Sequence, residues 1–183
     1  VEGEHAEADK LAGRREKVML ALPWLLACAI SDLRTRTVPA WLTIPPLLAG
    51  IGWTLWRGGW SLALLSLILL ALDDVPWRLR GMVGGLQGLL LWFAWREVGW
   101  GAVLLGLALI ALWLAWKLGV LGGADAQVLM TLALFFQPGV LLPVALAGGL
   151  QGLIQRLRGK ATLPAMLAIL AGTLFYLLVP KFH

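Results

Sequence analysis

Residues 98–120 read VGWGAVLLGLALIALWLAWKLGV, and the only charged side chain in this run is that of Lys117. A helix that crosses the hydrocarbon core of a bilayer needs roughly 20 mainly apolar residues, with about 17 at the low end. The run meets this requirement without help from its neighbours. We therefore expect a membrane-spanning helix here.

Further apolar runs lie on both sides, at about 18–31, 41–56, 60–72, 81–95, 126–136, 139–154 and 161–179. Several are shorter than a full span and must borrow flanking residues or pack as partial helices. Hydrophobic residues make up 60% of the 183-residue chain and charged residues 14%, whereas soluble domains are about 45–50% apolar. The pattern predicts an all-α fold, a polytopic transmembrane helix bundle of about eight helices, with six to eight as the range.

Charged residues gather in the short segments between runs, as topology signals do. If the run that ends at Asp32 finishes in the cytoplasm, the loops 32–40, 73–80, 117–125 and 155–160 are cytoplasmic, and they hold more Lys and Arg than the opposite loops. This bias favours a multi-pass protein of the cell membrane in that orientation, although the basic residues of the N-terminal tail argue the other way. The net charge of +5 then needs no nucleic acid partner, because no basic groove is visible.

Residues 1–17 mix acidic and basic side chains and are expected to form a disordered, solvated tail. Residues 18–183 are expected to form one transmembrane domain. The single cysteine, Cys28, follows a basic cluster and an apolar run, which is the arrangement of a lipoprotein signal. A buried, inert thiol is the favoured alternative, because Leu26 is large where such signals prefer a smaller residue.

Two aspartates stand at the ends of apolar runs. Asp32 lies in the segment SDLRTRTVPAWLT of residues 31–43, and Asp125 lies in LGGADAQVLM of residues 121–130. Four runs separate them, so both should emerge on the same face. Two carboxylates held close can share a proton, and then one acts as a base on water while the other acts as an acid. Taken singly, each aspartate is better explained as a solvated helix-end carboxylate, with Arg34 or Arg36 as the partner of Asp32, and only the two motifs together favour catalysis.

The two segments resemble those of the type IV prepilin peptidases and archaeal preflagellin peptidases, which are intramembrane aspartyl peptidases with a GxGD-type motif. Residues 32–43 are similar to the family pattern of Asp, then Val-Pro, then Leu-Thr, and Gly122-Gly123-Ala124-Asp125 is similar to the second motif. A weaker likeness is TLPAMLA at residues 162–168. The resemblance covers about residues 30–180. Departures are Gln127, where a Lys is common, Ala40, where an Asn is common, and a longer spacing between the aspartates.

The resemblance implies a membrane-embedded aspartic endopeptidase with Asp32 and Asp125 as catalytic residues, no metal and no cofactor. Its partner would be a pilin-like or archaellin-like precursor with a basic leader and a hydrophobic helix, cleaved at the cytoplasmic face. Gly122 and Gly123 would give room for the scissile strand, since glycine lets a backbone approach closely. The chain lacks the paired-cysteine segment of the two-function members, so N-methyltransferase activity is not expected.

Asp73 and Asp74 have two readings: a solvated loop, or a docking site for the basic leader. Two other functions remain open for the whole chain. One is a small ion- or proton-coupled transporter, which would place its aspartates at mid-membrane and contain internal repeats. The other is a non-catalytic membrane scaffold. Processing of a precursor separates all three.

Overall fold

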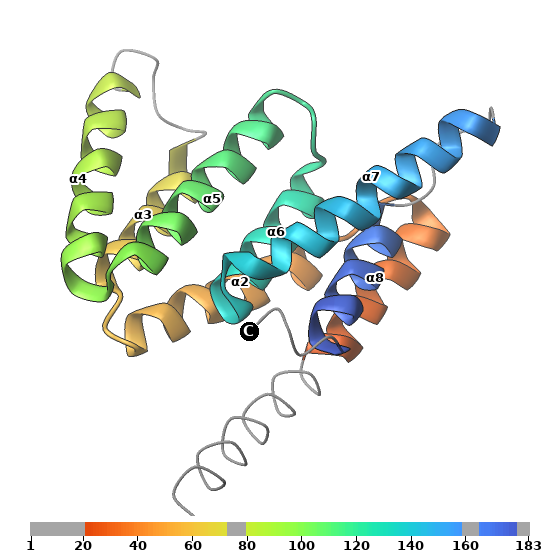
Figure 1. Cartoon of the computed structure of the whole chain (residues 1–183), viewed down its shortest axis with the longest axis horizontal. Coiled ribbons are helices and arrows are strands. Elements are labelled where there is room, and N and C mark those ends of the chain that lie inside the picture. Colours follow the sequence, from red (N-terminus) through yellow and green to blue (C-terminus); the bar gives the residue numbers. More distant parts are fainter. Residues whose placement is uncertain (1–20, 73–79, 159–164, 179–183) are drawn as a thin grey trace, which may run out of the picture. The chain divides into compact units, whose positions relative to one another are not determined.

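The computed structural model describes residues 21–72, 80–158 and 165–178, and every regular element in these ranges is helical (Figure 1). A first helix covers residues 21–35. It is followed by α2 (Ala40–Trp56), α3 (Trp60–Ala71), α4 (Arg80–Val98), α5 (Trp100–Lys117), α6 (Gly123–Phe136), a 3-10 turn η3 (Pro138–Val140), α7 (Leu141–Arg158) and α8 (Ala165–Leu178). The all-α prediction is confirmed, and each described helix overlaps one apolar run. The expected tail of residues 1–17 lies outside the described residues.

Among the described helices, α5 alone is both long and apolar enough to cross a membrane by itself. Shorter apolar helices lie at Trp60–Ala71, Gly123–Phe136, Pro138–Gln151 and Ala165–Leu178. A core helix of a soluble protein can have the same length and the same apolar composition. The polytopic membrane bundle therefore stays a prediction.

The chain divides into two compact units. The first contains residues 1–42 and 142–183, and the second contains residues 43–141. In the second unit α3, α4 and α5 pack on one another and α5 packs on α6, as Figure 1 shows. Leucine and alanine dominate the shared core, to which α2 through α6 all contribute; its members are Leu47, Ile51, Leu62, Ala63, Leu65, Leu69, Leu90, Ala94, Ala102, Leu105, Leu109, Met130, Ala133 and Leu134.

Two tight turns allow the helices of the second unit to reverse direction. Gly58, between α2 and α3, has φ 82°, and Gly99, between α4 and α5, has φ 96°. Residues with a Cβ rarely adopt these values. Glycine at these two positions therefore fixes where α3 and α5 begin.

Two adjacent prolines, Pro45 and Pro46, lie inside α2. Proline has no backbone N–H, so Pro46 cannot donate to the carbonyl of Leu42 four residues earlier. The indole Nε1 of Trp24 donates to that oxygen instead, at 2.7 Å. A side chain of the preceding helix thus supplies the hydrogen bond that the proline removes.

Four buried hydroxyls are satisfied within their own helices. Each donates to the carbonyl four residues earlier: Thr54 to Gly50, Ser66 to Leu62, Thr131 to Gln127 and Thr173 to Ile169. Ser and Thr commonly bond in this way inside helices. The thiol of Cys28 is also buried, as the sequence predicts.

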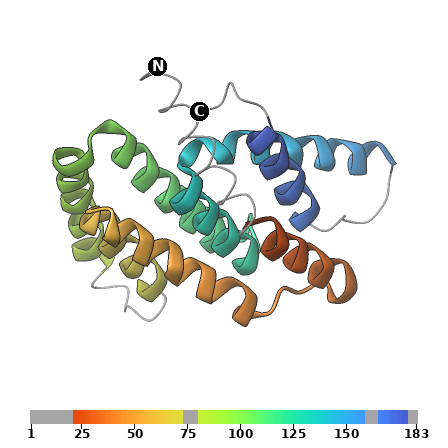
Figure 2. The same ribbon diagram turned by 90° about the horizontal axis from the view of Figure 1, so that it is seen from below.

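In the first unit, α7 and α8 cross at close range near Gly172 (Figure 2). A Cβ at Gly172 would lie 2.7 Å from the carbonyl oxygen of Pro143 and in collision with the Cα of Val144. Both obstacles are backbone atoms, which cannot swing away. The two helices can pack at this distance only because residue 172 has no side chain.

We expect Gly172→Ala to destabilise the protein by about 1–3 kcal/mol, because the added methyl forces the α7 and α8 backbones apart. Thermal unfolding of the purified protein, followed by circular dichroism, measures the effect. Gly148→Ala in α7 is the matched control, since a Cβ there meets no described atom within 4 Å. Alanine should stabilise that exposed helical position by up to about 1 kcal/mol. Equal unfolding temperatures for the two variants would contradict the close crossing.

Candidate functional site

Asp32 is tied to the N-terminus of α8. It lies three residues before the end of the first helix and is half-buried. Its Oδ2 accepts a hydrogen bond of 3.3 Å from the backbone N–H of Met166, the second residue of α8. The first N–H groups of a helix have no partner within the helix, and a carboxylate placed there is stabilising. The bond also joins the first aspartate segment to residues 162–168, whose described part begins at Ala165.

The turn after Asp32 is held by hydroxyl groups. The Ser31 hydroxyl donates to the carbonyl of Thr37 at 3.0 Å, and the Thr35 hydroxyl lies 2.9 Å from the carbonyl oxygens of both Ser31 and Thr37. Arg36 adopts φ 57°, and its N–H donates to the carbonyl of Asp32 at 3.0 Å. This is a left-handed helix end, which glycine usually occupies. A non-glycine residue in this conformation carries backbone strain, and such strain often marks functional sites.

Asp125 lies in the first turn of α6, where the helix dipole favours a negative charge. Its carboxylate folds back toward Gly122, because a Cβ built on Gly122 would lie 2.9 Å from its Oδ2. Gly122 has φ −66° and ψ 149°, which any residue can adopt. The Asp125 carboxylate therefore occupies the space that a Cβ at position 122 would take, and a larger residue there would displace it.

Gly123 makes room for an indole. A Cβ at this position would lie 3.1 Å from Nε1 of Trp116, near the end of α5. The neighbouring Lys117 places its ammonium 4.3 Å from the centroid of the same indole. Both glycines of the second motif thus accommodate side chains of this chain, and their role in binding a substrate stays a prediction.

A hydrogen bond joins the two motif-bearing segments inside the second unit. The hydroxyl of Thr43 donates to Oε1 of Gln127 at 2.6 Å, although the residues lie 84 positions apart. Thr43 is buried, with 1% of its surface exposed. Thr43 closes the first segment, and Gln127 lies two residues after Asp125. The start of α2 is therefore fixed against the N-terminal part of α6.

Sequence reasoning did not assign roles to Trp24, Thr43, Gln127 or Met166. Thr43 is the last residue of the first motif, and Gln127 is a departure from the second. Nothing in the sequence pairs them, because a hydrogen bond between distant segments has no periodic signature. Met166 acts through its backbone N–H, which every residue but proline has.

The described structure assigns the predicted site residues to two units. Asp32 belongs to the first unit, and Asp125, Gly122 and Gly123 belong to the second. Four described helices, α2 to α5, separate the aspartates along the chain, as the sequence predicts. Their joint use in catalysis stays a prediction. Asp73 and Asp74 lie outside the described residues.

Within the described ranges, no group of three or more His, Cys, Asp and Glu side chains is arranged to hold a metal ion. No known protein family matches the chain, and neither a curated protein nor a solved structure shows significant similarity to it. The chemistry of the aspartate segments must therefore be argued from their own residues.

We expect Thr43→Val to cost about 1–2 kcal/mol of stability, because Oε1 of Gln127 loses its donor. Gln127→Leu should cost a similar amount, and the double variant should cost less than the sum. Chemical denaturation of all three gives the coupling energy. Thr54→Val is the matched control, since that hydroxyl bonds only within its own helix. Additive losses, or a Thr43 cost no larger than that of Thr54, would refute the proposed link.

Proposed function

We propose that the protein is a membrane-embedded aspartyl peptidase that cleaves basic leader peptides from pilin-like or archaellin-like precursors at the cytoplasmic face of the cell membrane. The observation that carries the proposal is the hydrogen bond from Thr43 to Gln127. It holds the end of the Asp32 segment against the helix that carries Asp125. The bond joins the last residue of the first motif to a residue two positions after the aspartate of the second.

The environments of the carboxylates also support the proposal. Both are half-buried, and each is associated with the N-terminal turn of a helix, Asp32 with α8 and Asp125 with α6. Buried carboxylates are costly unless they have partners. Each carboxylate is thereby held in a defined position, as a general acid or base requires.

In the proposed reaction the ionised aspartate removes a proton from water, and the oxygen of that water attacks the scissile carbonyl. The protonated aspartate donates its proton to the carbonyl oxygen as the tetrahedral intermediate forms. When the intermediate collapses, the carbon–nitrogen bond breaks and the first aspartate gives its proton to the leaving amine. The second aspartate regains a proton from a hydroxyl group of the intermediate. The products are the leader with a new carboxylate and the mature chain with a new amine.

The surface of the second unit supports the membrane placement. α5 carries Trp100 at its first residue and Lys117, stacked on Trp116, at its last turn. Tryptophan and lysine at both ends of an apolar helix are typical of interface anchors. Large apolar side chains are exposed along it, including Leu104 and Leu107. Such a surface suits lipid and is unfavourable in water.

We expect Asp32→Asn and Asp125→Asn each to reduce cleavage of a co-expressed precursor by at least about 100-fold, because an amide cannot transfer the proton. Gel mobility of the precursor in isolated membranes measures the effect. The amide oxygen of Asn can still accept the N–H of Met166, so the unfolding temperature of Asp32→Asn should stay close to that of the parent protein. Glu97→Gln is the matched control and should cleave normally. Full cleavage by both Asn variants would reject the peptidase and favour a carrier or scaffold.

The membrane placement has a separate test. Because the helices expose large apolar side chains, the chain should remain in the membrane pellet after extraction with alkaline carbonate. A peripheral protein held only by charge should be released by the same treatment. Immunoblotting of pellet and supernatant measures the distribution. Release into the supernatant would contradict an integral membrane protein.

A further inference from the structure

Two turns of the second unit lie at the same end of its helices. The Ser61 hydroxyl, at the start of α3, donates to Oε2 of Glu97, near the end of α4, at 2.9 Å. The turn that leads into α3 is therefore next to the turn that leads out of α4. The side chains around these turns are tryptophan and arginine. We call Trp56, Arg57, Trp92, Arg96 and Trp100 the Trp/Arg end.

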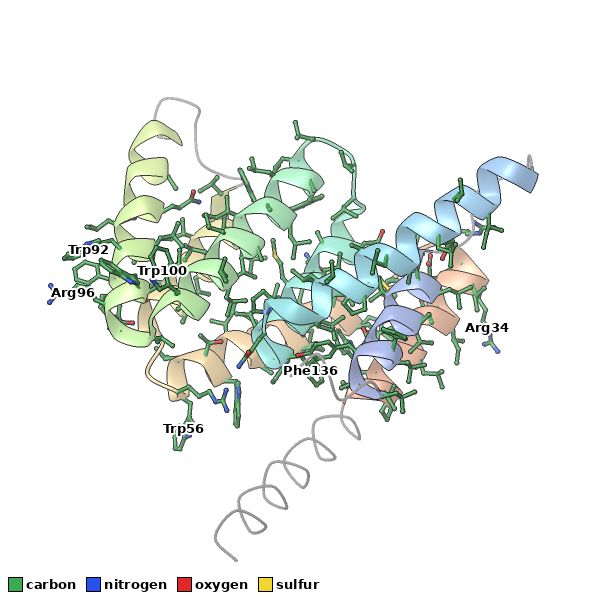
Figure 3. The ribbon with its side chains drawn as sticks, viewed as in Figure 1. Arg34, Trp56, Trp92, Arg96, Trp100 and Phe136 are labelled. Atoms are coloured by element: carbon green, nitrogen blue, oxygen red, sulfur yellow. The ribbon has the colours of Figure 1, made fainter. Side chains whose placement is uncertain are left out.

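The aromatic side chains of the Trp/Arg end are turned outward. Trp56 is 86% exposed and Trp100 is 70% exposed. Trp92 packs edge-on against Phe93, and Trp100 lies with its ring centroid 5.9 Å from that of Trp95. Figure 3 shows Trp92 and Arg96 pointing away from α4. Indole rings in this arrangement combine an apolar face with a polar N–H, which suits the boundary between hydrocarbon and headgroups.

Both arginines of the Trp/Arg end are stacked on indoles and lack acidic partners among the described residues. The guanidinium carbon of Arg57 lies 5.2 Å from the ring centroid of Trp53, and that of Arg96 lies 5.3 Å from the ring of Trp92. The neighbouring carboxylate of Glu97 accepts the Ser61 hydroxyl instead. Stacking orients a guanidinium and leaves its N–H donors free for an anion, and arginine matches phosphate oxygens well.

The length of α5 places the Trp/Arg end at a defined depth. Its 18 residues rise about 27 Å, close to the roughly 30 Å of a hydrocarbon core. Trp100 lies at one end, and Lys117, with the loop that leads to Asp125, lies at the other. If α5 spans the bilayer, the Trp/Arg end meets the leaflet opposite that loop.

We propose that the Trp/Arg end binds the phosphate of anionic phospholipid headgroups in that leaflet. Arg57 and Arg96 bind phosphate oxygens while the exposed indoles lie among the headgroups and upper acyl chains. The inference rests on the membrane placement of the proposed function, although not on its catalytic step. Peptide hydrolysis itself does not require a phospholipid at the Trp/Arg end.

The test uses the full chain in detergent micelles, titrated with phosphatidylglycerol or phosphatidylcholine, with bound lipids counted by native mass spectrometry. We expect the parent protein to prefer phosphatidylglycerol. The double variant Arg57→Gln/Arg96→Gln should bind phosphatidylglycerol about tenfold more weakly, since charge-assisted hydrogen bonds are lost. The matched control Arg34→Gln/Arg36→Gln removes the same charge elsewhere and should retain the preference.

An unchanged affinity in the Arg57→Gln/Arg96→Gln variant overturns the inference, as does an equal loss in the control. Competition by glycerol 3-phosphate at the same concentration as the lipid also overturns it, because the site would then be one for free phosphate. If the protein prefers phosphatidylglycerol but does not cleave precursors, the lipid site is supported and only the peptidase is rejected. Release of the chain by alkaline carbonate would remove the membrane placement on which the inference depends.

Discussion

Leucine covers both the interior and the exterior of these helices, and this constraint governs how they can recognise one another. When apolar side chains face every direction, burial gives little discrimination between one face and another. Which helix faces pack against each other must therefore be decided by their shape and by a few polar contacts. In the first unit it comes from Gly172, which lets α8 reach the backbone of α7. In the second it comes from the hydrogen bond between Thr43 and Gln127.

The same constraint shapes the candidate site. Asp32 and Asp125 are both placed at the N-terminal turns of helices, where orphan N–H groups and the helix dipole favour a carboxylate. Gly122 then leaves room for Asp125 to fold back over the chain. Each aspartate thus has a structural role that is independent of catalysis. The proposed chemistry uses carboxylates that the fold already holds in defined positions, and isosteric amide variants can separate the two roles.

The sequence predicted much of the fold because apolar runs and glycine or proline breaks are local signals. The helix α5 and the four helices between the aspartates follow from them directly. The site was predicted less completely. Trp24 donates to the carbonyl of Leu42, which Pro46 leaves unbonded, and Thr43 donates to Gln127. These contacts depend on how helices pack, and no periodicity records packing between segments far apart in the chain. Gly122 and Gly123 illustrate the difference between local signals and packing. The sequence shows where they are, but it does not show that they lie against the side chains of Asp125 and Trp116.

The hydroxyls of Thr54, Ser66, Thr131 and Thr173 each bond within their own helix. A hydroxyl that bonds within its own helix needs no hydrogen bond from a neighbouring helix. Under the proposed membrane placement, these four hydroxyls are satisfied before their helices pack, whereas the hydroxyls of Thr43 and Ser61 gain their partners only when helices meet. The contact between Thr43 and Gln127 can therefore form only after both α2 and α6 have entered the bilayer.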